Sequence, residues 1–377
     1  MFVTLQPYLK KTIMKVDFVG SFLAPIDFFE KRENYFHGEI DRETFERLAD
    51  KAIAGLVDDE LKAGLTEVSS GEFRRKSWDK DFFFGLDGIT VERLESGHLY
   101  TEENVLTDLM RITGRIGYNP EHPFFSDFEF LKETTAGRAV CRQTIPSPAE
   151  LYMRILMMTD GHPERIYPSP ETLLDDIAEA YNRTIRRFYE LGCRSLQLDD
   201  TVCGRLSDDS IMKELLQGGI DPIALQGDIL ALFNKSVDGI PADMELSVYL
   251  SAGDTVVPQW HAVESPDNFM PRLLSSLNVS RFYMPFNTGA PESVEIVKYI
   301  PAGKKLVMGV VDAHSPFPDN HTLLMATISE ALLYISPDKV FISPKTCFNL
   351  SSFDRRGLTY EDQWHKLGML SELAASF

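Results

Sequence analysis

The stretch KKLVMGVVDAHSPFPDN, residues 304–320, joins an apolar run to a polar loop rich in proline. The apolar run is typical of a buried strand, because it is short, contains several valines and shows no helical period. Asp312 and His314 follow this strand directly, where a loop begins. In parallel α/β folds the functional side chains lie at such strand ends. The stretch therefore predicts a parallel fold with a site at its rim.

Similar runs recur along the chain and alternate with segments of helical period. Eight runs are predicted as strands, at 16–21, 66–73, 139–146, 195–200, 244–251, 281–286, 305–311 and 339–344. Helical periodicity marks the segments 41–64, 169–192, 291–300, 320–335 and 360–376. Alternation of this kind favours parallel strands with crossover helices, and eight units favour an α/β (β/α)₈ TIM barrel. We expect one barrel domain over residues 16–377, after a flexible leader at 1–15.

The segment 74–138 separates the second and third predicted strands and is too long for a simple crossover. It is rich in aromatic and charged residues. We expect an insertion here, with helices and a β-hairpin, that lies over the mouth of the barrel.

Composition limits the class of partner. The net charge of -19 and the pI near 4.9 argue against nucleic acid and anionic membranes, since both require an excess of basic residues. No apolar stretch approaches the roughly 20 residues that span a bilayer. The four cysteines form no CxxC pair, as expected of reduced thiols in the cytoplasm. We expect a cytoplasmic protein with a small-molecule substrate, and its assembly into a homo-oligomer is left open.

Polar residues collect at the ends of the predicted strands. They are Gly20, Ser21, Glu72, Asp199, Asp200, Asp312 and His314. Carboxylates from different strands can hold an ammonium group while a histidine moves a proton. Any one of these residues is more simply explained by a strand end that meets water, but the set as a whole favours a site.

Several motifs at these ends resemble one known family. In chain order they are VGS (19–21), GEF (71–73), QLDD (197–200), DAHSP (312–316) and SPKTCF (343–348). Together they resemble the catalytic barrel of cobalamin-independent methionine synthase. The stretches VGSFLAP (19–25), RQTIPSP (142–148) and EDQWHKL (361–367) look more like the short single-barrel relatives of that enzyme.

The resemblance implies methyl transfer from a methylated folate to the thiol of homocysteine, in methionine biosynthesis. It also implies that Val19, Gly20, Ser21, Glu72 and Asp199 bind the amino acid. The proton donor would be His314. We include Asp200 in the expected substrate site and Asp312 in the expected catalytic pair.

The zinc ligands of that family are not matched. Tyr249, Ser251, Pro285 and Thr346 stand at the four ligand positions, and these residue types bind zinc poorly or not at all. Cys347 could act as a ligand shifted by one residue, but one thiolate does not make a zinc site. We therefore expect no zinc at the family's position and predict no cofactor with confidence.

Methyl-folate is retained as a possible co-substrate. The aromatic run SWDKDFFFG (77–85) could stack on a pterin, and Arg74, Arg75, Arg111 and Arg115 could meet an anionic tail, although packing and solvation are the commoner roles of such residues. Two functions stay open. The first is a methyltransferase of the methionine synthase type. The second is a diverged barrel that binds an amino-acid-like or folate-like ligand, or that performs other acid–base chemistry.

Overall fold

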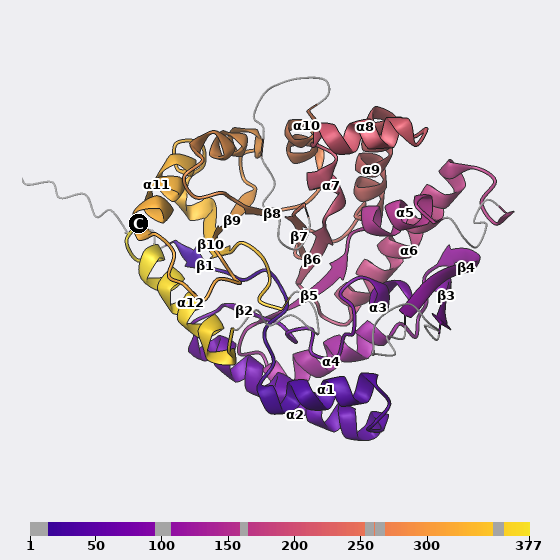
Figure 1. The fold of residues 1–377 in the computed structure, drawn as a ribbon, viewed down its shortest axis with the longest axis horizontal. Coiled ribbons are helices and arrows are strands. Elements are labelled where there is room, and N and C mark those ends of the chain that lie inside the picture. Colours follow the sequence, from indigo (N-terminus) through magenta and orange to yellow (C-terminus); the bar gives the residue numbers. More distant parts are fainter. Residues whose placement is uncertain (1–13, 95–106, 159–164, 253–259, 261–267, 350–357) are drawn as a thin grey trace, which may run out of the picture.

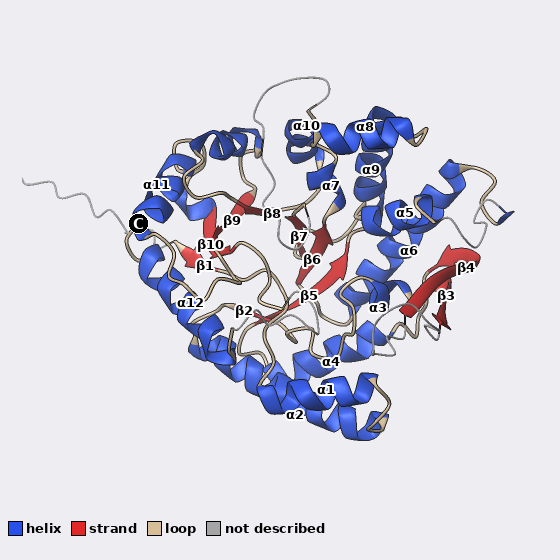
Figure 2. Ribbon diagram, viewed as in Figure 1, coloured by secondary structure: helices blue, strands red, loops and turns tan. Residues whose placement is uncertain are grey.

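The eight-stranded parallel sheet predicted for this chain is present in its computed structural model, which describes residues 14–94, 107–158, 165–252, 260, 268–349 and 358–377. The order of the strands is β1-β10-β9-β8-β7-β6-β5-β2, and every ladder in it is parallel. The strands lie in the middle of the molecule and the helices surround them (Figures 1 and 2). This is the arrangement of a TIM barrel.

The eight strands agree closely with the predicted segments, except at the two edges of the sheet. They are β1 (Lys15–Val16), β2 (Glu67–Val68), β5 (Val140–Pro146), β6 (Ser195–Asp200), β7 (Glu245–Leu250), β8 (Arg281–Pro285), β9 (Lys305–Val311) and β10 (Val340–Pro344). Only β1 and β2 are much shorter than predicted. The chain is already buried at Met14 and paired at Lys15, so the barrel starts one residue before the predicted boundary, and residues 1–13 of the expected leader lie outside the described residues.

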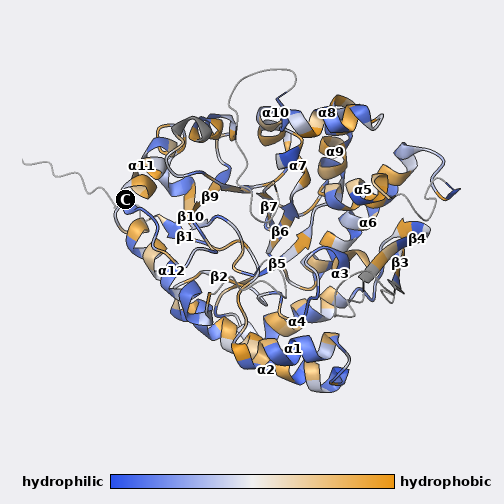
Figure 3. Cartoon of the chain, in the orientation of Figure 1, coloured by the Kyte–Doolittle hydropathy of each residue, from blue (hydrophilic) through white to orange (hydrophobic). Residues whose placement is uncertain are grey.

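The helices connect successive strands or extend the loops between them. They are α1 (Ile26–Phe36), α2 (Arg42–Lys62), α5 (Pro148–Leu156), α6 (Pro170–Glu190), α7 (Val202–Arg205), α8 (Asp209–Gln217), α9 (Pro222–Ser236), α10 (Phe269–Ser276), α11 (His321–Ala331) and α12 (Tyr360–Ala374). The outer helices carry both hydrophilic and hydrophobic residues along their length (Figure 3). Of those described, none is both long and apolar enough to cross a membrane.

The predicted helix at 291–300 is a 3₁₀ helix, η2 (Pro291–Tyr299); a second, η3 (Pro337–Lys339), precedes β10. Residues three apart share one face of a 3₁₀ helix. The tighter turn therefore brings Val294 and Val297, both buried, onto the same inward face.

The insertion between the second and third barrel strands contains the expected helices and hairpin. Its elements are α3 (Lys80–Phe83), β3 (Asp87–Leu94), β4 (Thr107–Gly117) and α4 (Pro123–Thr135). The hairpin is antiparallel, and Arg115 at its base bonds to Asp176 of α6 at 2.5 and 2.7 Å. Residues 95–106, which contain its tip, lie outside the described residues, so a position over the barrel mouth stays a prediction.

A buried ionic network crosses the interior near the start of the strands. Arg142 of β5 bonds to Asp17 at 2.5 Å and to Glu67 of β2 at 2.8 Å. Arg281 of β8 bonds to the same two carboxylates at 3.0 and 2.7 Å. Because β6 and β7 separate β5 from β8 in the sheet, both arginines reach the same partners only if the sheet curls into a barrel.

The charges in this network depend on one another. Burial by itself would raise the pKa of Glu67, but the positive charges of Arg142 and Arg281 outweigh it and lower that pKa. A carboxylate held in this way is destabilised as soon as one arginine is removed.

We expect Arg142→Met to lower the free energy of unfolding by about 3–5 kcal/mol, because it leaves buried carboxylates without a counter-charge. Urea denaturation followed by circular dichroism measures this. The matched control is Arg138→Met, which removes a surface arginine bonded to Asp58 at 2.7 Å and should cost no more than about 1 kcal/mol. Equal losses in the two variants would contradict a special role for the buried network.

Candidate functional site

Two carboxylates dominate the C-terminal end of the barrel. Glu72 follows β2, and Asp199 is near the end of β6. They are electrostatically coupled, since the charge of Glu72 is one of the causes that raise the pKa of Asp199. The structure thus brings together the two acidic residues that the sequence assigned to one pocket.

Glu72 is held tightly although its side chain keeps an exposed fraction of 12%. Its Oε1 accepts a hydrogen bond from the Thr144 hydroxyl at 2.7 Å and lies 3.0 Å from an Arg75 nitrogen. Its backbone φ is +61°, a left-handed conformation that is uncommon outside glycine. Strained residues of this kind cluster at functional sites.

Asp199 lies near the end of β6 and is surrounded by protein. The Gln197 amide donates to its Oδ1 at 2.7 Å. Burial, and then the neighbouring charge of Glu72, raise the pKa of Asp199 well above its usual value. A bound cation would oppose this shift, because it favours the ionised form of the carboxyl.

Asp200 points away from Asp199, because successive side chains of a strand point to opposite faces. Its carboxylate accepts from the Ser147 hydroxyl and from the backbone N–H of Cys203, both at 2.6 Å, and it is fully buried. Asp200 thus fixes the starts of α5 and α7, and its assignment to the substrate site stays a prediction.

The segment Val19–Gly20–Ser21 borders the carboxylates. The Val19 carbonyl accepts from the Gln197 amide at 2.5 Å. A side chain at Gly20 would come to 3.5 Å from Glu72 Oε1, so the bare backbone lies against that carboxylate. The Ser21 hydroxyl donates to the Asn349 carbonyl at 2.6 Å. The resemblance assigns these three residues to the amino-acid ligand, and that role stays a prediction.

His314 is fixed by its contacts in the loop after β9. Its Nε2 lies 2.9 Å from the Cys347 carbonyl, which can only accept, so Nε2 carries the proton. In the neutral imidazole Nδ1 then has a lone pair, and it lies 3.5 Å from the Thr346 hydroxyl. Asp312 accepts from the backbone N–H of His314 at 2.8 Å. Asp312 thus shapes the loop that carries His314, and its catalytic role stays a prediction.

The positions that correspond to zinc ligands are occupied by groups with other partners. The Tyr249 hydroxyl donates to the Lys345 carbonyl at 3.2 Å, and Ser251 is buried. The Pro285 carbonyl accepts from the indole of Trp260 at 2.6 Å. Among the described residues, no three His, Cys, Asp or Glu side chains are grouped so that they could hold a metal. The residues present do not fit a zinc ion.

A cavity of about 910 Å³ that the sequence did not predict lies between β4, α5, α7 and α8, just after the end of β6. Ser21, Glu72, Asp199 and His314 are not among the residues that line it. Its lining includes four methionines, Met110, Met153, Met157 and Met158, together with Trp78 and charged residues such as Arg111 and Glu150. Burial, and then the charge of Asp200, raise the pKa of Glu150 to about 7.

The sequence does contain a signal for this cavity. Glu150, Met153, Arg154 and Met157 are spaced i, i+3, i+4 and i+7, so they share one face of α5. Of the aromatic run proposed as a stacking platform, Phe82 and Phe83 are fully buried in the core, whereas Trp78 lines the cavity.

Comparison with known proteins supports the family resemblance. The sequence matches none of the known family models. It is 28% identical over 366 residues to the uncharacterised protein YxjH of Bacillus subtilis, covering 97% of this chain and 95% of that one. It is 21% identical over 347 residues to a methionine synthase of Pyrococcus abyssi, covering 91% and 88%.

Solved structures agree with the sequence relatives. A vitamin-B12-independent methionine synthase candidate of Listeria monocytogenes has a TM-score of 0.74 and 29% identity, with 96% of each chain covered. An enzyme of this kind from Shewanella, in complex with selenomethionine, has a TM-score of 0.66 and 16% identity, over 96% and 97% of the chains. The chain is thus similar in sequence and in fold to the cobalamin-independent methionine synthases, and its single barrel fits the short relatives of those enzymes.

Proposed function

We propose that this protein binds a sulfur amino acid at the barrel mouth and transfers a methyl group to or from its sulfur. The observation that carries the proposal is the pair Glu72 and Asp199, which lies beside the bare backbone of Gly20 and beside Ser21. Two carboxyl groups suit the α-ammonium of an amino acid. The acceptor that the resemblance suggests is homocysteine, and the product is methionine.

The raised pKa of Asp199 couples ligand binding to the ionisation of this carboxyl. Burial favours its protonated form, and an arriving ammonium group favours the ionised form. The pair Glu72 and Asp199 then carries the negative charge that the ligand needs. The selenomethionine in the related Shewanella structure is consistent with this class of ligand.

Methyl transfer to a thiol also requires a proton to leave the sulfur. A new C–S bond forms, the bond between the methyl group and its carrier nitrogen breaks, and that nitrogen gains a proton. The neutral imidazole of His314, with its lone pair on Nδ1, is suited to move a proton at the mouth. No step is assigned to zinc, since the residues at its position do not fit it.

The cavity lined by methionines is the proposed place of the methyl donor. Thr201 lines the cavity and follows Asp199 by two residues in the chain. Flexible methionine side chains adapt to a planar apolar ligand, and Trp78 and Arg111 offer a ring and a positive charge. Methyl-folate has the matching chemistry, with a flat pterin and an anionic tail.

A second function is favoured by the residues at the four positions that correspond to zinc ligands, which are Tyr249, Ser251, Pro285 and Thr346. An unactivated thiol with a pKa near 8.5 is mostly protonated at neutral pH, so it is a weak nucleophile. The barrel would then bind an amino-acid-like ligand without methyl transfer. Assay of methionine formation from homocysteine and methyl-folate separates the two functions.

We expect Glu72→Gln and Asp199→Asn each to weaken binding of L-methionine at least tenfold, because a hydrogen bond to a charged group is worth about 1.5–3 kcal/mol. Affinity of the unsubstituted protein should rise as pH rises through the pKa of Asp199, and Asp199→Asn should abolish that rise. Titration calorimetry measures both.

The control is Asp243→Asn, which removes the same charge near the start of β7, where Tyr189 donates to it at 2.9 Å. It should bind methionine normally. Unchanged affinity in both site variants would remove the assignment of the amino-acid pocket.

We expect the purified protein to hold no stoichiometric zinc at the barrel mouth, because a zinc site needs three or four Cys, His or carboxylate ligands. Plasma emission analysis measures the metal content. A chelator should leave methionine binding unchanged. One zinc per chain, with methionine formation that the chelator stops, would restore the ordinary zinc mechanism of the family.

We expect Met153→Trp to fill part of the cavity and to block methyl-folate binding while methionine binding stays normal. Binding of the donor is monitored by the quenching of tryptophan fluorescence, both in the unsubstituted protein and in Trp78→Phe. The matched control is Leu333→Trp, at an exposed residue that follows α11. Donor binding that survives Met153→Trp would place the donor elsewhere.

A further inference from the structure

Glu60 is a fully buried carboxyl group that has no part in the site as described so far. It lies on α2, two turns after Ile53, and its relative exposure is 0%. Its two oxygens accept from the backbone N–H of Ser69 at 3.1 and 3.2 Å, and Oε1 also lies 3.2 Å from the Ser69 hydroxyl. A carboxyl is rarely buried in this way without a specific reason.

The contacts continue from Ser69 to the turn that carries Glu72. The Ser69 hydroxyl accepts from the backbone N–H of Gly71 at 3.1 Å. The Gly71 carbonyl in turn accepts from Phe22 N–H at 3.3 Å, next to Ser21. A line of hydrogen bonds therefore runs from Glu60 to both backbone segments that border the amino-acid pocket.

The turn itself is strained. Gly71 has φ +62°, and a Cβ there would come within 2.4 Å of a Leu56 methyl carbon. Glu72 follows with φ +61°. Two successive left-handed residues, the second with a full side chain, persist only when the surroundings impose them. Glu60 provides such surroundings from a separate, rigid helix.

We infer that Glu60 is a positioning residue, which holds the 69–72 turn so that the Glu72 carboxylate faces the bound amino acid. The inference rests on the proposed function, since it assigns Glu72 to that pocket. It adds a residue that never touches the ligand. Removal of Glu60 should misplace Glu72 and Gly71 without changing any group that binds directly.

Ser69 requires acceptor oxygens on the side chain at position 60 more than it requires a negative charge there. Burial raises the pKa of Glu60 well above its usual value, while its bonds to Ser69 and the charge of Arg142 act in the opposite direction. Glutamine keeps one acceptor oxygen at the same place, whereas alanine keeps none. The pair Glu60→Gln and Glu60→Ala therefore separates positioning from the simple presence of a side chain.

The experiment combines titration calorimetry with L-methionine and hydrogen exchange of the peptide over residues 69–75, in the full chain. Glu60→Ala should bind methionine at least tenfold more weakly and exchange faster in that peptide. Glu60→Gln should stay within about threefold of the unsubstituted protein. Should Glu60→Ala fail to fold, Ser69→Ala removes the link to Gly71 and should show the same two changes.

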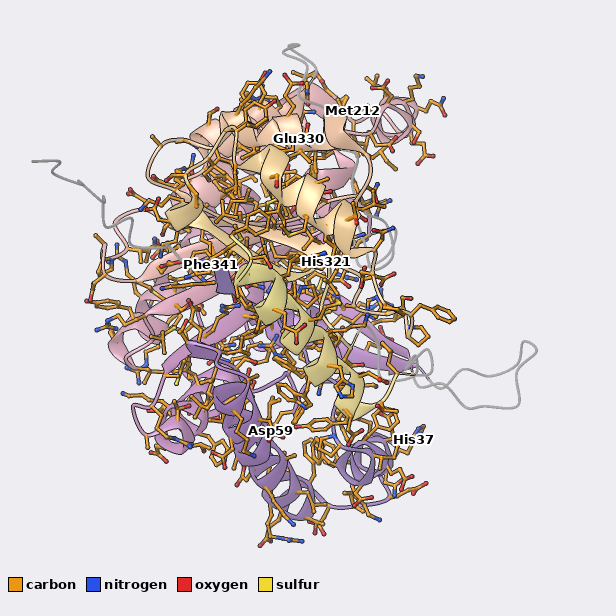
Figure 4. The ribbon with its side chains drawn as sticks, turned by 90° about the vertical axis from the view of Figure 1, so that its left-hand side faces the viewer. His37, Asp59, Met212, His321, Glu330 and Phe341 are labelled. Carbon is orange, nitrogen blue, oxygen red and sulfur yellow. The ribbon has the colours of Figure 1, made fainter. Side chains whose placement is uncertain are left out.

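The control for general loss of stability is Ile53→Ala, another fully buried residue of α2. It should lower the melting temperature but leave both methionine affinity and exchange of 69–75 unchanged. Figure 4 shows Asp59, next to Glu60 on α2; its carboxylate accepts from the Tyr360 hydroxyl at 2.8 Å, and Asp59→Asn serves as a second control.

The two readouts keep this inference apart from the proposed function. Failure of the unsubstituted protein to bind methionine would count against the proposed function, and exchange of the 69–75 peptide would still decide the role of Glu60. Normal affinity and normal exchange in Glu60→Ala would overturn the inference. So would equal losses in Ile53→Ala, because the effect would then follow stability alone.

Discussion

Arg142 is the residue on which the closure of the barrel depends. In the part of the chain that the structure describes, no ladder joins β1 to β2, the two edge strands of the sheet. Arg142, from β5, bonds to Glu67 on one side of this seam and to Asp17 and the Phe18 carbonyl on the other. Phe22 N–H then bonds to the Gly71 carbonyl further along. The seam is therefore closed by side chains and by one backbone hydrogen bond.

This mode of closure determines the shape of the mouth. The chain after Val16 is released from the ladder, so Val19, Gly20 and Ser21 can cross toward Glu72. Gln197 fixes the same segment from β6, because its amide bonds to both the Val19 carbonyl and Asp199. The ionic network below the mouth and the acidic pair within it thus share one framework. The ionic network stabilises the fold near the start of the strands. This stability offsets the unfavourable proximity of the two carboxyl groups at the C-terminal end of the barrel.

The fold was predictable because its signals are local. Buried parallel strands are continuous apolar runs, and β9 was predicted over Lys305–Val311, to the residue. The position of Glu72 and Asp199 at the same end of the barrel could be predicted from its topology. The orientation of the Asp200 side chain, opposite to that of Asp199, also follows from the alternation of side chains along a strand. By contrast, the ring contacts of His314 and the setting of Glu72 depend on residues distant in sequence, such as Cys347 and Thr144, and no spacing predicts them.

The replaced ligand positions bear on what kind of chemistry this barrel supports. A zinc site at the mouth would need ligands from β7, β8 and the loop after β10, and here each of these places contributes a buried group with a partner of its own. Tyr249 bonds across to the Lys345 carbonyl, and Trp260 bonds to the Pro285 carbonyl, so hydrogen bonds link these places in this barrel. His314, in the loop after β9, lies 3.5 Å from the Thr346 hydroxyl in the loop after β10. The side-chain hydrogen bonds of Glu72, Asp199 and Gln197 involve none of these positions, so the proposed amino-acid pocket is structurally separate from them. A change at the ligand positions can therefore alter the proposed reaction and still leave the proposed pocket intact.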